Sequence, residues 1–197
     1  MSNRLMSNRL MSNRLMSQAT EPAAKALTAT ITTPIGPFTV ITVQRPDSPG
    51  PVVLASGWTD RVDELSALIS PRLRPETVRL VDAIDGVTDV ATAYHEGDLA
   101  SIDDVAVEQV SGPFMMQAWK VLRTVPAGGP ISYTGFAESC GSPTAVRAAA
   151  SACARNAAAL FVPCHRVLRG DGSLGGFRYG LPAKAWLLDH EAGAAAA

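Results

Sequence analysis

Apolar and polar residues alternate along residues 27–44, "LTATITTPIGPFTVITVQ", on both sides of a Pro-Ile-Gly-Pro segment. This alternation, carried by β-branched residues, predicts two strands joined by a turn. The apolar run 52–57 predicts another strand, whereas the apolar residues of 61–69 have helical spacing. A second helix is expected within 86–100, and residues 104–110 form a strand or a connector. The front part of the chain is therefore expected to be a small sheet with helices.

Helical spacing dominates the second half of the chain. The segment 112–125 collects its apolar side chains on one helical face, made of Phe114, Ala118, Val121, Leu122 and Val125. A short helix is expected in 131–140, with Ser132 as its N-cap and Gly141 at its end. A closing amphipathic helix is expected around Trp186, Leu187 and His190.

An alanine-rich helix is expected directly after the short one. In "SPTAVRAAASACARN" Ser142 is a suitable N-cap, Pro143 fits the first helical position, and alanine has high helix propensity. Two short helices joined by a Cys-Gly-Ser turn are typical of a helix-turn-helix. The small residues after Arg147 let this helix approach either a neighbouring helix or a nucleic-acid groove. Arg147 is then a solvated surface arginine or a side chain that reaches into a partner.

Composition and charge limit the classes of protein. The chain has 197 residues, of which 47% are hydrophobic, enough to bury a core. No apolar run reaches the ~18 residues that a membrane span needs. Through Ser111 the chain has 9 Lys and Arg against 14 Asp and Glu, whereas the remainder has 8 against 4. The basic second half indicates contact with an anion such as nucleic acid, or ordinary scatter of surface charge.

The chain begins with the pentamer MSNRL repeated three times. A period of five matches neither a helix nor a strand, so we expect residues 1–26 to be a disordered tail. We expect an N-terminal α/β domain in 27–108 and a second domain in 109–197. The predicted fold class is α+β, a small sheet domain followed by a mainly helical domain with a winged-helix-like helix-turn-helix.

Cysteine usage excludes some kinds of site. No CxxC or HxxxH spacing is present, so a structural zinc site is not expected, and neither is a cofactor. The odd number of cysteines does not fit a secreted disulfide framework. The three are Cys140, Cys153 and Cys164.

The segment "FVPCHRVL" (161–168) raises the question of a reactive thiol. Pro163 favours an extended, buried Cys164, and burial would raise the pKa of its thiol. A reactive Cys164 would need a base, for which His165 is the candidate through a bridging water, and Glu191 is the candidate acid that orients it. The alternative is a packed, inert cysteine.

A glycine-rich loop, "GDGSLGGFRYG" (170–180), follows the cysteine. It lacks the GK[ST] pattern of a phosphate-binding loop. Its nearness to Cys164 suggests a pocket wall or lid, in which Phe177 and Tyr179 offer a flat apolar surface for a ring. The alternative is an ordinary surface loop.

Five sequence blocks occur in order and at close spacing. They are "ISYTGFA" (131–137), "AVRAAASACARN" (145–156), "PCHRV" (163–167), "GSLGGF" (172–177) and "KAWLLDHE" (184–191). Together they resemble the O6-alkylguanine-DNA alkyltransferases, also called methylated-DNA–protein-cysteine methyltransferases. The resemblance covers about residues 112–191, and the front part resembles that family only through "TPIGPFTV". It implies that 109–197 is a DNA-binding and alkyl-acceptor domain.

The resemblance implies DNA repair by irreversible alkyl transfer from O6-alkylguanine, and also from O4-alkylthymine, to Cys164 in a single turnover. His165 would take the thiol proton through a water, and Glu191 would hold His165. Tyr133 would donate to the base and crowd the phosphate. Asn156 would connect the alanine-rich helix, the DNA-recognition helix of the family, to the cysteine segment.

The resemblance further implies that the target base is flipped out through the minor groove. Arg147 would fill the vacated stack. The implied DNA-binding residues are Tyr133, Thr134, Ser142, Arg147 and Ala148. The implied guanine pocket has backbone groups of Cys164, Val167 and Arg178 in its wall, beside Phe177 and Tyr179.

The chain departs from the family pattern at several positions. Asn156-Ala157 stands where the family usually has Asn-Pro, and Ala149 or Ala150 where several members have glycine. Tyr179 replaces a small residue of some relatives, so we expect it to narrow the pocket and disfavour bulky alkyl groups.

The implied partner is double-stranded DNA carrying O6-alkylguanine. We expect a monomer without membrane association and a cytoplasmic localisation. Two alternatives stay open: a non-catalytic protein that binds alkylation lesions, and an unrelated cysteine hydrolase. The presence of Cys164 argues against the first, and the second gives no role to Arg147 or Tyr133.

Overall fold

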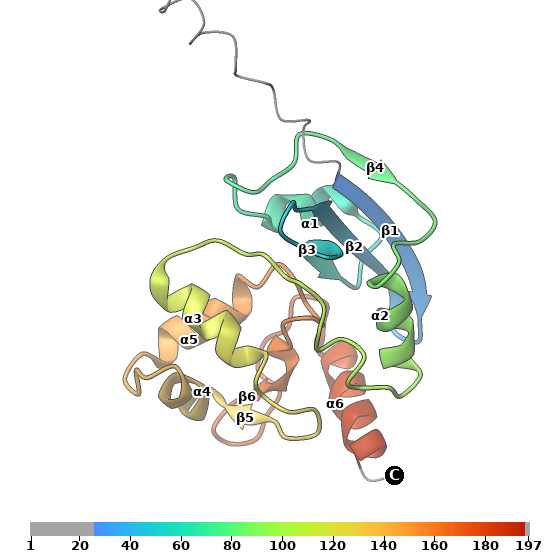
Figure 1. Ribbon diagram of the computed structural model, residues 1–197. Coiled ribbons are helices and arrows are strands. Elements are labelled where there is room, and N and C mark those ends of the chain that lie inside the picture. The colour runs from blue at the N-terminus through green and yellow to red at the C-terminus, as the bar shows by residue number, and fades with distance from the viewer. Residues whose placement is uncertain (1–25, 196–197) are drawn as a thin grey trace, which may run out of the picture.

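The computed structural model describes residues 26–195 and shows a four-stranded sheet beside a group of short helices (Figure 1). The strand order is β3-β2-β1-β4, with antiparallel β1–β2 and β2–β3 pairs and a parallel β1–β4 pair. The strands are β1 (Ala26–Thr33), β2 (Gly36–Gln44), β3 (Pro51–Gly57) and β4 (Val78–Leu80). The tail expected for 1–26 lies outside the described residues, except that Ala26 already belongs to β1.

The hairpin predicted in 27–44 is confirmed. Pro34 and Ile35 form its turn, and Gly36 follows with a φ of +116°, a backbone conformation that glycine adopts without a Cβ clash. The two predicted helices of this half are also present. They are α1 (Val62–Leu68), which packs on β2 and β3, and α2 (Thr88–His95), which packs on β1.

The second half is mainly helical, so the α+β fold class is confirmed. Its elements are α3 (Pro113–Leu122), β5 (Ile131–Ser132), α4 (Tyr133–Ser139), α5 (Val146–Ala154), the 3₁₀ helix η1 (Cys164–Arg166), β6 (Val167–Leu168) and α6 (Leu181–Ala195). As predicted, Ser132 caps α4, because its hydroxyl accepts a hydrogen bond from the Gly135 amide at 3.0 Å. The α3, α4 and α5 helices pack against one another, and β5 pairs with β6 in parallel.

The predicted start of the alanine-rich helix was wrong. The helix α5 begins at Val146, after an Ala145 N-cap, and not at Pro143. The amide of Ala145 donates to the carbonyl of Ser142 at 2.9 Å, so this stretch closes a separate turn before the helix. Pro143 lies in that turn, where its fixed φ is equally acceptable. The connection between α4 and α5 is therefore longer than expected.

Two segments outside the sheet, the connector 104–110 and residues 157–159, lie along β3 and join the second half to the sheet. The connector 104–110 forms a bridge in which the Val53 amide donates to Ala106 at 2.8 Å and the Glu108 amide donates to Val53 at 2.9 Å. Residues on both sides of this junction share one hydrophobic core, which includes Phe38, Val53, Tyr94, Leu122, Phe136 and Leu187. The two halves therefore fix each other's position.

The chain between α5 and the cysteine first lies against β3 and then turns sharply. The Ser56 amide donates to Ala157 at 2.9 Å, and the Ala159 amide donates to the Ser56 carbonyl at 3.1 Å. After this contact with β3 the chain turns sharply, with Leu160 at a φ of +79°. The Val162 amide then donates back to Ala158 at 2.9 Å. The sheet thus determines where the next residues lie.

Candidate active site

Cys164 opens the 3₁₀ turn η1, which overturns the expectation of an extended cysteine segment. Pro163 precedes it with φ −81° and ψ +66°, and the Arg166 amide donates to the Pro163 carbonyl at 3.1 Å. A 3₁₀ helix has about three residues per turn, so neighbouring side chains point roughly a third of a turn apart. Cys164 and His165 therefore face different parts of the structure, and both side chains are buried.

The Cys164 side chain lines a cavity of about 540 Å³. The cavity lies between α4, α5 and the glycine-rich loop, and apolar atoms dominate its surface. The residues around it are Tyr133, Ala150, Cys153, Ala154, Asn156, Ala159, Cys164, Gly176, Phe177, Arg178 and Tyr179. Of the predicted pocket residues, Val167 is missing from this set, because it is fully buried in β6.

Asn156 connects the end of α5 to the cysteine segment. Its amide nitrogen donates to the Val162 carbonyl at 2.7 Å, and its amide oxygen accepts from the Ala158 amide at 3.1 Å. Gln109 of the connector donates to the same oxygen at 3.0 Å. All hydrogen-bonding groups of this buried side chain thereby hold backbone or connector atoms around the cysteine turn.

Burial raises the pKa of the Cys164 thiol, so the uncharged form is favoured at rest. The Asn156 side chain and the positive charge of Lys184 act against this rise in pKa. A thiolate formed during a reaction would therefore meet a polar and a positive group in otherwise apolar surroundings.

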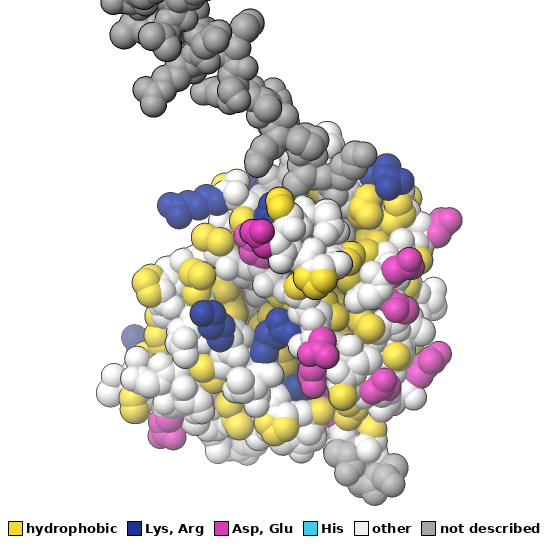
Figure 2. All heavy atoms as spheres, in the orientation of Figure 1, with side chains coloured by type: hydrophobic (Ala, Val, Ile, Leu, Met, Phe, Trp, Pro, Cys, Tyr) yellow, Lys and Arg dark blue, Asp and Glu magenta, His cyan; other side chains and the backbone are white. Residues whose placement is uncertain are grey.

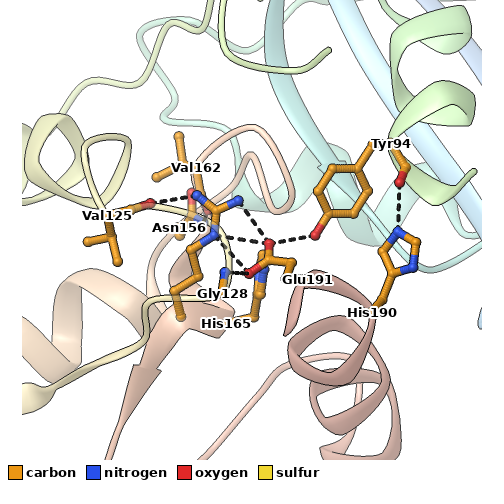
Figure 3. Close-up of polar contacts among 9 residues, drawn as sticks. Tyr94, Val125, Gly128, Asn156, Val162, His165, His190 and Glu191 are labelled. Atoms are coloured by element: carbon orange, nitrogen blue, oxygen red, sulfur yellow. Dashed lines mark hydrogen bonds and ion pairs between the residues drawn. The ribbon is translucent and has the colours of Figure 1, made fainter. Parts of the chain in front are cut away.

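Glu191, on α6, lies at the centre of a buried hydrogen-bond cluster (Figure 3). Its Oε1 lies 2.8 Å from Nε2 of His165 and accepts from Arg166 Nη2 at 2.8 Å. The Arg166 Nε donates to both carboxylate oxygens, at 3.0 and 3.1 Å, and its Nη1 donates to the Val125 carbonyl at 2.6 Å. The Gly128 amide approaches Oε2 at 3.4 Å. The predicted His165–Glu191 contact is therefore present in the structure.

The charge state of this cluster follows from its contacts. Burial alone would raise the pKa of Glu191, but the hydrogen bonds and charges of His165 and Arg166 outweigh it and lower the pKa to about 2. Burial also lowers the pKa of His165, against the attraction of Glu191, so the imidazole is neutral near pH 7. Since a carboxylate can only accept, Nε2 carries the proton and Nδ1 is the basic nitrogen. That Nδ1 is buried and has no hydrogen-bond partner among the described residues.

Lys184 is a functional candidate that the sequence reasoning missed. Its side chain is fully buried, and its Nζ donates to the Val167 carbonyl at 2.6 Å and to the Leu174 carbonyl. Burial lowers the pKa of this amine, while the Cys164 and Cys153 thiols act in the opposite direction. Its place within the block "KAWLLDHE" was the available signal, because a lysine on the buried face of a helix is rare.

Arg166 and Tyr94 also take part in the cluster without having been predicted. Arg166 stands inside the block "PCHRV", so a buried cation beside Glu191 could have been suspected there. Tyr94 donates its hydroxyl to Glu191 Oε1 at 2.6 Å from α2, 97 residues away. No local sequence pattern near Tyr94 indicates this contact.

The aromatic residues of the glycine-rich loop have defined positions. The Tyr179 hydroxyl donates to the Ser56 carbonyl at 3.2 Å, and a Cβ added to Gly57 would lie 1.8 Å from that hydroxyl oxygen. The rings of Phe177 and Trp58 each lie in contact with Tyr179, at centroid distances of 5.6 Å. Tyr179 is therefore fixed between the sheet and the cavity. Its expected effect on bulky alkyl groups stays a prediction.

The predicted DNA-binding residues gather on α4, on α5 and on the turn between them, apart from the Glu191 cluster. Thr134 and Arg147 are exposed, while Ser142 and Ala148 are partly exposed. Tyr133 is half-buried and is the one predicted DNA-binding residue that also lines the Cys164 cavity. On the face shown in Figure 2, most acidic side chains lie on the side of α2, and one lies at the lower left, near α4.

The fold and the site define an α+β protein with a buried cysteine beside a histidine–glutamate pair. A family model described as the 6-O-methylguanine DNA methyltransferase, DNA binding domain matches residues 113–193. A methylated-DNA–protein-cysteine methyltransferase of Shigella flexneri is 33% identical over 163 residues, which span 82% of this chain and 92% of that protein. The bifunctional transcriptional activator/DNA repair enzyme Ada of Escherichia coli is 54% identical over 79 residues, 40% of this chain and 22% of that protein.

A solved structure extends the likeness to the whole fold. Mycobacterium tuberculosis OGT in complex with DNA matches with a TM-score of 0.68 and 30% identity, over 85% of this chain and 94% of that chain. The chain therefore belongs to the methylated-DNA–protein-cysteine methyltransferases, a family of DNA-binding repair enzymes.

Two findings bear on membranes and metals. Within residues 26–195, no helix is both long and apolar enough to cross a membrane. In the same range, no three His, Cys, Asp or Glu side chains are grouped so that they could hold a metal ion. The expected monomeric state and cytoplasmic localisation stay predictions.

Proposed function

We propose that the protein repairs DNA by moving an alkyl group from O6 of guanine, and from O4 of thymine, to the sulfur of Cys164. The observation that carries this proposal is the buried Cys164 thiol on the wall of a cavity, next in sequence to a histidine held by a buried glutamate. The product is a thioether, whose carbon–sulfur bond is stable in water, so we expect each molecule to act once.

The proposed transfer conserves atoms and charge. The sulfur–carbon bond forms as the carbon–oxygen bond to the base breaks. The thiol proton passes through a water molecule to Nδ1 of His165, the buried nitrogen that is free to accept. The departing base takes up one proton in return, with Tyr133 on the cavity wall as the proposed donor. The His165 imidazolium then releases its proton to water and the Tyr133 oxygen regains one from water, so both side chains end as they began. Glu191 stabilises the imidazolium that forms in between.

The buried position of Cys164 requires the target base to leave the duplex. An oxygen inside the base stack cannot reach the sulfur of Cys164, a residue that is only 9% exposed, so we propose that the base is flipped into the cavity. The exposed Arg147 on α5 would then occupy the vacated stack from the minor groove. The small residues around it, among them Ala148, let α5 approach the groove closely.

Intact-mass measurement tests the proposed function directly. The full chain is incubated with duplex DNA that contains one O6-methylguanine. We expect a gain of one methyl group per protein molecule, located on the peptide that contains Cys164, with no further gain when DNA is in excess. Binding to the lesion without a mass gain would instead support a non-catalytic lesion-binding protein.

Replacing Arg147 with alanine is expected to slow transfer from duplex DNA by about tenfold, since the flipped state loses the side chain that fills the stack. Reaction with the free base O6-methylguanine, which needs no flipping, should keep its rate. Single-turnover rates on the two substrates provide the measurement.

The matched control for this variant is Arg155→Ala, which removes another exposed positive charge, at the C-terminal end of α5. It should lower the duplex rate much less than Arg147→Ala does. Equal losses on duplex and free base in Arg147→Ala would refute the flipping role.

A further inference from the structure

The Glu191 carboxylate receives a hydrogen bond from the other half of the molecule. The Tyr94 hydroxyl, on α2 beside the sheet, donates to Oε1 at 2.6 Å (Figure 3). That oxygen is the same one that faces Nε2 of His165. Tyr94 and the proposed base, His165, therefore contact the same carboxylate oxygen, although the helix that carries Tyr94 belongs to the front part of the chain.

Tyr94 is held in place by contacts on several sides. Its side chain is fully buried. The ring of His190 lies edge-on to the Tyr94 ring at a centroid distance of 5.6 Å, and Nε2 of His190 bonds to the Tyr94 carbonyl oxygen at 2.7 Å. His190 directly precedes Glu191 on α6, so these contacts fix the position of Tyr94 on α2 relative to Glu191 on α6. The hydroxyl can therefore act as a fixed donor.

We propose that Tyr94 is a positioning residue for alkyl transfer: its hydroxyl keeps the Glu191 carboxylate aligned to accept the Nε2 proton of His165. This inference rests on the proposed function and assigns the front half of the chain a part in it. Burial and the charge of Glu191 raise the pKa of Tyr94, so the phenol stays protonated and remains a donor at all working pH values.

The charges around the pair determine the expected effect of losing this donor. The groups that face the carboxylate or its imidazole are Tyr94 from α2, Arg166 from η1 and Lys184 from α6. With Arg166 and Lys184 unchanged, a carboxylate that loses the Tyr94 hydrogen bond holds its negative charge less well. It therefore favours the protonated imidazole more strongly, and the pKa of His165 rises.

The test compares Tyr94→Phe with the unchanged chain in single-turnover transfer from O6-methylguanine DNA across a range of pH. We expect a rate about tenfold lower near neutral pH, because the carboxylate loses the hydrogen bond that keeps it aligned with Nε2 of His165. We also expect the acidic limb of the pH–rate profile to move to higher pH, because more His165 is protonated at a given pH.

The matched control is Ser56→Ala, which removes a different buried hydrogen bond between the halves, from the Ser56 hydroxyl to the Ala159 carbonyl at 2.7 Å. Its acidic limb should stay in place even if its melting temperature falls. Were Tyr94→Phe to keep the normal rate and limb, or to show only a lower melting temperature, the positioning role would be wrong. If the unchanged chain itself transfers no methyl group, the proposed function fails, whatever the variant shows.

Discussion

A Cys164→Ser protein is expected to gain no methyl group from O6-methylguanine DNA while still folding and binding that DNA. Serine is close to cysteine in size, so the buried turn η1 and the cavity should keep their shape. A hydroxyl loses its proton far less readily than a thiol, and its oxygen is a much weaker nucleophile than sulfur toward the carbon of an alkyl group. Intact mass and a DNA-binding titration, recorded on the same sample, measure the two properties.

The cavity itself offers the control for this prediction. Cys153 is the second thiol on its wall, and burial raises the pKa of both thiols. Only for Cys164 does the hydrogen bond of the Asn156 side chain act against this rise, and only Cys164 adjoins His165. Cys153→Ser should therefore still gain one methyl group. A methyl gain that survives in Cys164→Ser and disappears in Cys153→Ser would exchange the roles of the two thiols.

Regular secondary structure was predictable because it depends on local patterns. Alternating β-branched residues around the Pro-Ile-Gly-Pro turn identified the hairpin, and helical spacing identified α1, α3 and α6. The start of α5 was misplaced because Ser142 and Pro143 suit either a helix start or a tight turn. The choice between these depends on how α4 and α5 pack, which the local sequence does not contain.

The course of the backbone between α5 and Cys164 could not be predicted for a different reason. Leu160 adopts a positive φ, which few non-glycine residues do, and nothing in the "AAALFV" segment signals it. Contacts with β3 explain it: Ser56 bonds to both Ala157 and Ala159 and fixes the segment against the sheet edge. A conformation imposed by a strand about a hundred residues away requires the tertiary structure.

In the active site, too, the residue types were predictable from local sequence, whereas their contacts depend on the tertiary structure. Cys164, His165 and Glu191 stand in two recognisable blocks, so their types were predictable, but whether Glu191 reaches His165 depended on the position of α6. Arg166 lay within a recognised block without an assigned role. Tyr94 had no signal, because a tyrosine on an amphipathic helix is normally a core residue.

Replacing Glu191 with glutamine is expected to lower the free energy of unfolding by about 3–5 kcal/mol, as breaking a buried ion pair does. The Arg166 charge would be left buried without its counter-charge. The glutamine amide group would also point a donor at groups that donate themselves, namely the Tyr94 hydroxyl, Nε2–H of His165 or the Arg166 guanidinium. Urea unfolding near pH 7 measures this loss.

The stability lost in Glu191→Gln should depend on pH. The pKa of Glu191 is about 2 in the fold against an ordinary value of 4.5, so its ionised form binds its partners only in the folded state. Its contribution to stability is complete above pH ~4.5 and is lost as the pH falls toward ~2. The difference in unfolding free energy between the unchanged chain and Glu191→Gln should therefore be constant at neutral pH and shrink through this interval.

Transfer should suffer as much as stability does. Without a negative charge beside it, the His165 imidazolium is no longer stabilised when it takes the thiol proton, so we expect the single-turnover rate to fall by about a hundredfold or more. Asp189→Asn is the matched control, because it removes an exposed carboxylate from the same helix and should leave both rate and stability unchanged. A Glu191→Gln protein with a normal rate would mean that the thiol loses its proton without help from the histidine. Catalysis would then depend on the polar and positive groups around Cys164, of which Lys184 and Asn156 are the nearest candidates.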